Sequence, residues 1–184
     1  MEAVQLRPYQ SIAVHQVFDA WRAGNRSVVL VAPTGMGKRV IALWLMEYAA
    51  KAGRRVLFVG NRRLLITQAK DDAERYGIDY GTIMADAETG NPASTNQLAS
   101  IQTLESWYFY EKFTAEATGR GLPPADLLVI DEGHQDIARV SSFLRFIRWR
   151  RSWCSLQPQS EQKANQSCRR LTRSWSSRSS IRSS

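Results

Sequence analysis

Ala32-Pro33-Thr34-Gly35-Met36-Gly37-Lys38-Arg39 is the stretch of this chain that decides its fold class. It nearly matches the pattern Gly-x-x-x-x-Gly-Lys-Ser/Thr, in which backbone N–H groups surround phosphates, the Lys contacts the outer phosphates and the hydroxyl binds Mg²⁺. Ala32 replaces the first Gly, and Arg39 replaces the hydroxyl residue. A guanidinium cannot ligate a cation, and it adds positive charge beside the expected Mg²⁺. The stretch therefore predicts phosphate binding with impaired use of Mg²⁺.

The segments around this loop alternate between strand and helix patterns. Ser27–Val31 is a continuous apolar run, typical of a parallel strand that is buried on both faces. Alternating strands and helices predict an α/β fold with an open, mostly parallel sheet, whose ligand lies at the carboxyl ends of the strands. Further strands are expected at 56–59, 81–84, 98–101 and 127–130, and helices at 8–23, 40–51 and 64–76.

Asp131-Glu132-Gly133-His134 follows the last clear apolar strand. A carboxylate at this position can hold Mg²⁺ through water, and its neighbour can position the water that attacks a phosphoryl group. The alternative is that Asp131 and Glu132 only end a strand. Because a Gly-Lys loop also follows a strand upstream, the combination favours the catalytic interpretation.

These elements together resemble superfamily 2 helicases of the DEAD/DEAH type, and most closely the bacterial repair and type III restriction-like branch. Leu6-Arg7-Pro8-Tyr9-Gln10 is similar to the segment that places a Gln on adenine, 32–39 to motif I and Asp131–His134 to motif II. Val56–Gln68 and Ala99–Leu104 resemble two elements that contact the nucleic-acid backbone. Five elements occur in the family's order over about 130 residues, but Arg39 and Gly133 depart from the motifs.

The resemblance implies a RecA-like domain that uses ATP and Mg²⁺ and acts on nucleic acid, with DNA favoured over RNA as the substrate. It implies catalytic roles for Lys38, Asp131, Glu132 and His134, with Asp131 on the metal. The implied nucleotide contacts are Gln10, Pro33, Thr34, Gly35, Met36, Gly37, Lys38 and Arg39, and the implied nucleic-acid contacts are Arg62, Arg63, Ser100, Gln102 and Thr103. Arg62 and Arg63 are also compatible with a solvated helix start. The aromatic residues between Trp107 and Phe113 could stack bases, although core packing is the preferred interpretation.

The net charge of +8 is unevenly distributed along the chain. Residues 1–140 hold 15 Lys+Arg and 16 Asp+Glu, whereas residues 141–184 hold 10 Lys+Arg and only Glu161. We therefore predict an incomplete RecA-like domain at 1–140 and an irregular, basic tail at 141–184. This tail suggests an alternative function, a non-enzymatic protein that binds nucleic acid electrostatically. A P-loop ATPase with a different partner is a third possibility, which Leu6–Gln10 and Ala99–Leu104 argue against.

The tail is also compatible with translation out of frame. One base back from Cys154, the permitted codons of Cys154–Ser160 can encode Leu-Thr-Ala-Thr-Pro, which is motif III of the resembling family. The hypothesis is a frameshift near 138–145 that truncates the motor before its second RecA-like domain. Together with Arg39, it predicts little or no ATP hydrolysis. The nucleotide sequence in all frames tests it.

Two features bear on the location of the chain. Met1–Pro8 carries Glu2 and Arg7 and has no apolar signal segment, and the apolar run Val40–Ala50 is interrupted by Glu47 and too short to span a bilayer. We expect a cytoplasmic protein without a membrane contact.

Overall fold

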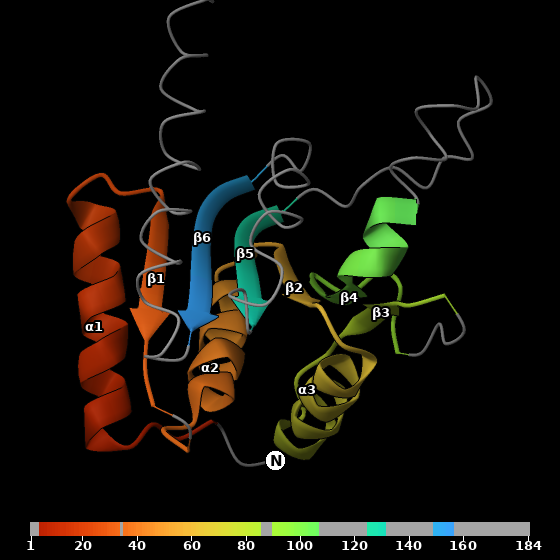
Figure 1. Cartoon of the computed structure of the whole chain (residues 1–184), viewed down its shortest axis with the longest axis horizontal. Coiled ribbons are helices and arrows are strands. Elements are labelled where there is room, and N and C mark those ends of the chain that lie inside the picture. The colour runs from red at the N-terminus through yellow and green to blue at the C-terminus, as the bar shows by residue number, and fades with distance from the viewer. Residues whose placement is uncertain (1–3, 34, 86–89, 107–124, 132–148, 157–184) are drawn as a thin grey trace, which may run out of the picture.

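The computed structural model describes residues 4–33, 35–85, 90–106, 125–131 and 149–156. Within these ranges a six-stranded sheet has the order β1-β6-β5-β2-β4-β3 (Figure 1). All of its neighbouring strands are parallel. The α/β class and the parallel sheet are therefore confirmed. The strands are β1 Ser27–Val31, β2 Val56–Gly60, β3 Gly81–Ile83, β4 Asn96–Ser100, β5 Ala125–Asp131 and β6 Trp149–Leu156.

Three long helices accompany the sheet: α1 Pro8–Arg22, α2 Lys38–Lys51 and α3 Arg63–Tyr76. Pro8 occupies the first helical turn of α1, where a missing N–H costs little. α2 begins two residues earlier than the apolar pattern indicated, because Gly37 adopts a left-handed conformation and caps it. Gly77 ends α3 in the same conformation. In the described ranges, none of the helices combines the length and the apolar character that a membrane span requires.

The core lies between these helices and one face of the sheet. Val56, Phe58 and Val129 are at most 1% exposed and pack with the buried residues of α1, α2 and α3. Phe18 of α1 contacts Trp44 and Tyr48 of α2 edge-on or at a tilt, so aromatic packing joins the two helices. Residues of the opposite sheet face are buried as well, as shown by Leu57, Leu128 and Ile130. Burial on both faces explains the continuous apolar runs of the central strands.

Strand β6 corrects the prediction that the chain is irregular from residue 141. It lies between β1 and β5 and pairs with both, for example Val28 with Trp153 and Val129 with Trp153. The sequence pattern did not predict this strand, because two Arg and two Ser occur among its eight residues. Buried parallel strands are usually rich in Val and Ile. The edge of β5 that faces β1 is therefore covered by β6. Residues 157–184 lie outside the described part.

Candidate functional site

The candidate site lies at the carboxyl edge of the sheet, where the strand arrows of β1, β6 and β5 end together (Figure 1). β1 leads into the loop that begins at Ala32, and β5 ends at Asp131. One strand separates them, since Val31 pairs with Leu156 of β6 and Ile130 pairs with Cys154. Two interstrand spacings of about 4.8 Å place the loop and Asp131 roughly 10 Å apart. The topology thus brings together two motifs that are about a hundred residues apart in sequence.

The loop between β1 and α2 turns tightly on its glycines. The N–H of Met36 donates to the carbonyl of Pro33 at 3.3 Å, and Gly35 and Gly37 have φ angles of +83° and +74°. These are left-handed conformations that L side chains rarely adopt. Gly37 then starts α2, whose N-terminus therefore points into the loop. A helix N-terminus with glycine-rich backbone is suited to an anion. Thr34 lies outside the described residues.

The Lys38 side chain folds back over this loop. It is 9% exposed, and its Nζ donates to the carbonyl oxygens of Ala32 at 3.0 Å and Pro33 at 3.3 Å. The ammonium is therefore held at the end of β1, next to the α2 N-terminus. The first turn of α2 carries Lys38 and Arg39 and contains no acidic residue. A cation at the positive end of a helix dipole is unfavourable unless an anion lies nearby.

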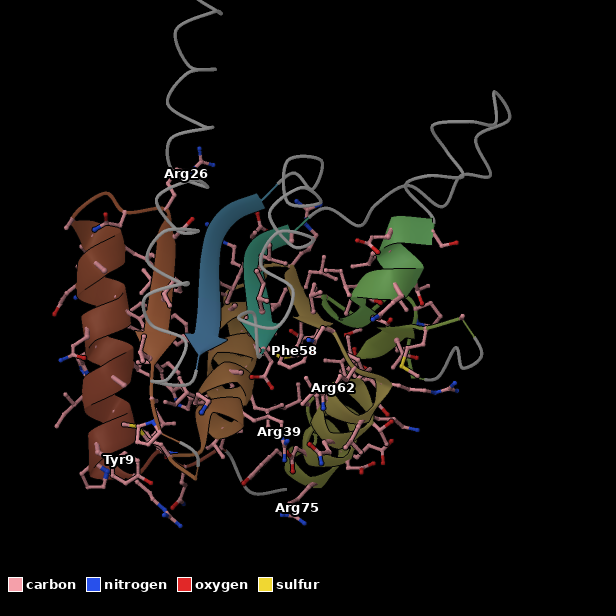
Figure 2. All side chains as sticks on the ribbon, in the orientation of Figure 1. Tyr9, Arg26, Arg39, Phe58, Arg62 and Arg75 are labelled. Atoms are coloured by element: carbon pink, nitrogen blue, oxygen red, sulfur yellow. The ribbon has the colours of Figure 1, made fainter. Side chains whose placement is uncertain are left out.

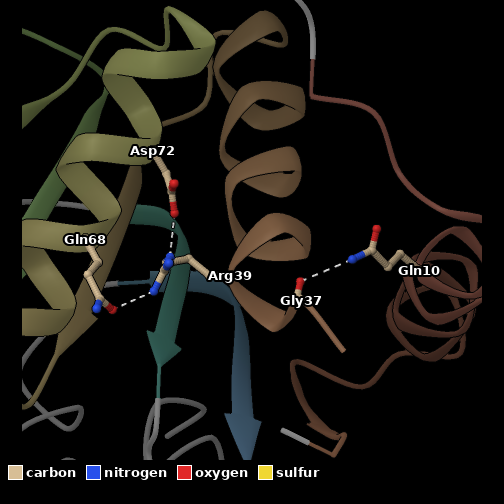
Figure 3. Close-up of polar contacts among 5 residues, drawn as sticks. All are labelled: Gln10, Gly37, Arg39, Gln68 and Asp72. Atoms are coloured by element: carbon tan, nitrogen blue, oxygen red, sulfur yellow. Dashed lines mark hydrogen bonds and ion pairs between the residues drawn. The ribbon is translucent and has the colours of Figure 1, made fainter. Parts of the chain in front are cut away.

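Gln10 of α1 contacts the loop directly. It is 3% exposed, and its Nε2 donates to the carbonyl of Met36 at 3.1 Å. The same Nε2 donates to the carbonyl of Gly37 at 3.4 Å (Figure 3). Its Oε1 accepts a hydrogen bond from the N–H of Arg7 at 2.9 Å. In the structure, the amide of Gln10 therefore attaches α1 to the 32–39 loop. The predicted contact with adenine would require these hydrogen bonds to be exchanged.

The Arg39 side chain points away from the loop and onto α3, as Figures 2 and 3 show. Its Nε lies 2.5 Å from Oδ2 of Asp72, and its Nη1 donates to Oε1 of Gln68 at 2.7 Å. The prediction that this guanidinium adds charge at the Mg²⁺ position is therefore wrong for the side chain. The physical reason is that Asp72 on α3 accepts a hydrogen bond from the guanidinium and balances its charge. Position 39 still lacks the hydroxyl that would bind Mg²⁺. Sequence reasoning did not find Gln68 and Asp72, since only the packing of α2 against α3 makes them partners.

Asp131 ends β5, is 7% exposed and pairs in register with Gly60 of β2. A buried carboxylate at this edge is a suitable ligand for Mg²⁺, directly or through water. Position 39 offers no oxygen ligand, and the described residues contain no cluster of three His, Cys, Asp or Glu side chains that could hold a metal. The fit for Mg²⁺ thus rests on one carboxylate. Glu132 and His134 lie outside the described residues.

The predicted nucleic-acid residues gather at the same edge, one strand further along the sheet. Arg62 and Arg63 are exposed at the start of α3, directly after β2, and Gly60 pairs with Ser100 at the end of β4. Gln102 joins the two segments, because its Nε2 donates to the carbonyl of Asn61 at 2.6 Å and its Oε1 accepts from the hydroxyl of Ser100 at 2.7 Å. Thr103 is 7% exposed, and this burial does not fit the predicted direct contact.

A hollow of about 610 Å³ lies at the opposite, amino edge of the sheet. Its lining includes Tyr48 near the end of α2, Arg54 before β2 and Asp126 near the start of β5. Lys38 and Asp131 stand at the other ends of α2 and β5, so the hollow is separate from the candidate site.

Comparisons with known proteins agree with this architecture. The family model described as "Type III restriction enzyme, res subunit" matches residues 3–164. A type I restriction enzyme EcoAI endonuclease subunit of Escherichia coli is 30% identical over 146 residues, which is 77% of this chain and 17% of that protein.

Two solved structures share the fold. The Sulfolobus solfataricus SWI2/SNF2 ATPase core in complex with dsDNA superposes with a TM-score of 0.64 at 14% identity, covering 83% of this chain and 32% of that one. A nuclease-deletion mutant of the type ISP restriction-modification enzyme LlaGI, in complex with a DNA substrate mimic, gives 0.63 at 18% identity, covering 82% and 17%. The chain thus spans a third or less of the proteins it resembles.

Proposed function

Because this chain belongs to the family of type III restriction enzyme res subunits, whose fold is that of superfamily 2 ATPase cores, we propose that it is the ATP-binding part of a DNA motor. ATP binds at the carboxyl edge of the sheet, between the 32–39 loop and Asp131. Hydrolysis by this chain is slow or absent, since position 39 lacks the metal-binding hydroxyl. The intact motor uses a second RecA-like domain, which completes the nucleotide site.

One observation carries the proposal: two helices that begin with cations and lack acidic residues in their first turns start at this edge. α2 begins with Lys38 and Arg39, and α3 begins with Arg63 after Arg62. Arg39 is paired with Asp72, so Lys38 is the cation that adds to the positive end of the α2 dipole, and Arg62 and Arg63 do so at α3. Each site therefore favours a bound anion. Nucleotide phosphates suit the α2 end, where the glycine loop surrounds it, and nucleic-acid phosphates suit the exposed α3 end. The two solved structures of similar fold that contain DNA or a DNA mimic support DNA as the second ligand.

The residues of the site have separate tasks in this proposal. Bound ATP with Mg²⁺ would supply the phosphoryl group to be transferred and the charge that neutralises it. Lys38 exchanges its backbone carbonyl partners for phosphate oxygens, and Gly37 allows the backbone to approach them. Asp131 would hold the metal directly or through water, and Glu132 would position the attacking water in the manner of motif II. Gln10 holds α1 against the loop.

Replacement of Lys38 tests the nucleotide site. We expect Lys38→Ala to weaken ATP binding by at least tenfold, or about 1.4 kcal/mol, because it removes a charge-assisted hydrogen bond. Lys51→Ala is the matched control, since Lys51 lies at the other end of α2 and its side chain is 70% exposed. Titration calorimetry with ATP measures both. Equal affinities of the two variants would contradict the proposed site.

Replacement of Arg39 tests the reason for impaired turnover. Arg39→Thr restores a hydroxyl next to Lys38, and we expect Mg²⁺ to raise the ATP affinity of this variant about tenfold more than that of the wild type. Helicase activity is not expected to return. Calorimetry with and without Mg²⁺ measures the difference. If Mg²⁺ affects both proteins equally, the missing hydroxyl is not the defect.

The alternative function, a non-enzymatic nucleic-acid-binding protein, rests on the basic C-terminal segment. Residues 157–184 hold one acidic residue, Glu161, and six basic ones, Lys163, Arg169, Arg170, Arg173, Arg178 and Arg182. Any deletion must start after Leu156, because an earlier one removes β6 from the sheet. The proposed motor surface predicts that Arg62→Ala with Arg63→Ala weakens DNA binding and lowers the salt slope by roughly 2, with or without residues 157–184. If only the deletion weakens DNA binding, the alternative is correct.

A further inference from the structure

Arg39 connects the phosphate loop to α3 through two contacts, with Asp72 at 2.5 Å and with Gln68 at 2.7 Å (Figure 3). We call this set the Arg39 bridge. The side chains of Arg39 and Asp72 are 34% and 21% exposed, so the ion pair is partly shielded from solvent. If Arg39 were only the loss of a metal-binding hydroxyl, its side chain would need no specific partner. Here the guanidinium has two matched acceptors.

The geometry of the bridge is specific to an arginine. Gln68 and Asp72 are four residues apart and therefore share one face of α3. The guanidinium carries donors in a planar fork, so one side chain can reach both acceptors at once. Threonine is too short to reach across from α2, and lysine has no fork.

One end of the bridge lies at the proposed nucleotide site, and the other lies on the helix that begins at the proposed DNA site. Arg39 follows Lys38 in the first turn of α2, which forms part of the phosphate loop. Gln68 and Asp72 belong to the helix that begins at Arg63, after the exposed Arg62. Figure 2 shows Arg39 between the two helices, with Arg62 toward the start of α3. A helix moves as a stiff unit, so this contact offers a physical route by which a shift of the α2 N-terminus around a nucleotide would reach α3.

We infer that Arg39 is a positioning residue that couples nucleotide binding at the loop to DNA binding at the start of α3. This inference rests on the proposed function and adds a role for the residue that departs from the motif. Coupling is reciprocal, so each ligand changes the affinity for the other by the same factor.

The experiment compares the dissociation constant of a short duplex DNA with and without saturating ATPγS, in the full chain. The measured quantity is the ratio of the two constants. For the wild type we expect a ratio that differs from one by about fivefold or more.

Asp72→Asn is the decisive variant, because it removes the ion pair and leaves the phosphate loop untouched. We expect its ratio to fall to within twofold of one, while Asp72→Glu retains most of the wild-type ratio. Asp71→Asn is the matched control, since it makes the same charge change at the next, exposed position of α3, and it should keep the wild-type ratio. A thermal melt of Asp72→Asn with a midpoint lowered by only about 2–4 °C shows that the variant is folded.

The possible failures are distinguishable. If the wild type binds no ATPγS, both the proposed function and the inferred coupling through the Arg39 bridge are wrong. If the wild type binds both ligands and Asp72→Asn shows the same ratio, the bridge is only a structural contact and the inference is overturned, while the proposed function stands. A wild-type ratio of one overturns the coupling in the same way.

Discussion

Single residues in the phosphate loop show how strongly backbone geometry constrains this site. Gly37 has a φ of +74°, and a Cβ added to it would lie 2.5 Å from Nε2 of Gln10. Gly35 has a similar φ of +83°, but a Cβ there would meet nothing within 4 Å. Both positions need glycine for conformation, while only Gly37 also needs it for space. Lys38 and Arg39, the next two residues, diverge completely, one toward the loop and one toward α3.

We predict that Gly37→Ala destabilises the protein more than Gly35→Ala does. The left-handed conformation costs an alanine about 1–2 kcal/mol at either position, and at 37 the methyl group also displaces the buried Gln10 side chain. Each 1 kcal/mol corresponds to about 2–4 °C in a chain of this size. Thermal unfolding measures both variants. Adding Gln10→Ala to Gly37→Ala should recover part of the loss, and equal melting points for the two single variants would contradict the packing argument.

At the scale of elements, β6 is the part of the fold that connects the two halves of the site. In the described sheet β1 pairs only with β6, and β6 alone joins it to β5. The phosphate loop therefore keeps its position relative to Asp131 through this strand. The family match, which extends to residue 164, also includes β6. The frameshift hypothesis remains a prediction for the nucleotide sequence, but residues 149–156, which overlap the codons of the supposed motif III, form a strand in the chain as written.

We predict that Trp153→Pro severely destabilises the protein, by about 3 kcal/mol or more, because proline removes a ladder hydrogen bond from a central strand and clashes with its neighbours. Ser152→Ala in the same strand keeps the backbone N–H and is the control. Denaturant unfolding followed by circular dichroism compares them. A Trp153→Pro variant as stable as Ser152→Ala would mean that residues 149–156 do not form the central strand.

At the scale of the whole molecule, an ion pair joins the starts of β2 and β5 at the amino edge of the sheet. Asp126 at the start of β5 accepts a hydrogen bond from the N–H of Arg55 at 3.0 Å, and its Oδ2 lies 3.4 Å from Nε of Arg55. The backbone hydrogen bond from Arg55, and then the charges of Arg55 and Arg54, hold the pKa of Asp126 below its ordinary value of 3.8. Because the pKa is lower in the folded state, this contact stabilises the protein above the unfolded-state pKa, and the stabilisation is lost as the pH falls through the folded-state pKa.

We predict that Asp126→Asn makes stability less dependent on pH in the acid range. The melting temperature of the wild type should fall more steeply than that of the variant as the pH drops from about 5 to about 2. Asp19→Asn is the control, since Asp19 forms an exposed pair with Arg22 and its side chain is 70% exposed. Thermal melts at several pH values measure this, and parallel curves for wild type and Asp126→Asn would contradict it.

The sequence by itself determined the fold class, and it predicted the glycine loop after β1 and the edge of the sheet where the candidate site lies. These depend on local patterns, namely apolar runs, glycine positions and a carboxylate after a strand, and the chain records such patterns residue by residue. Only the tertiary structure decided where the Arg39 guanidinium goes, which groups Gln10 binds and that residues 149–156 form the central strand. Each of these depends on partners distant in sequence: Asp72 and Gln68 for Arg39, the loop carbonyls for Gln10, and β1 and β5 for β6. A side chain's partner is set by which elements pack together, and packing is a property of the whole fold.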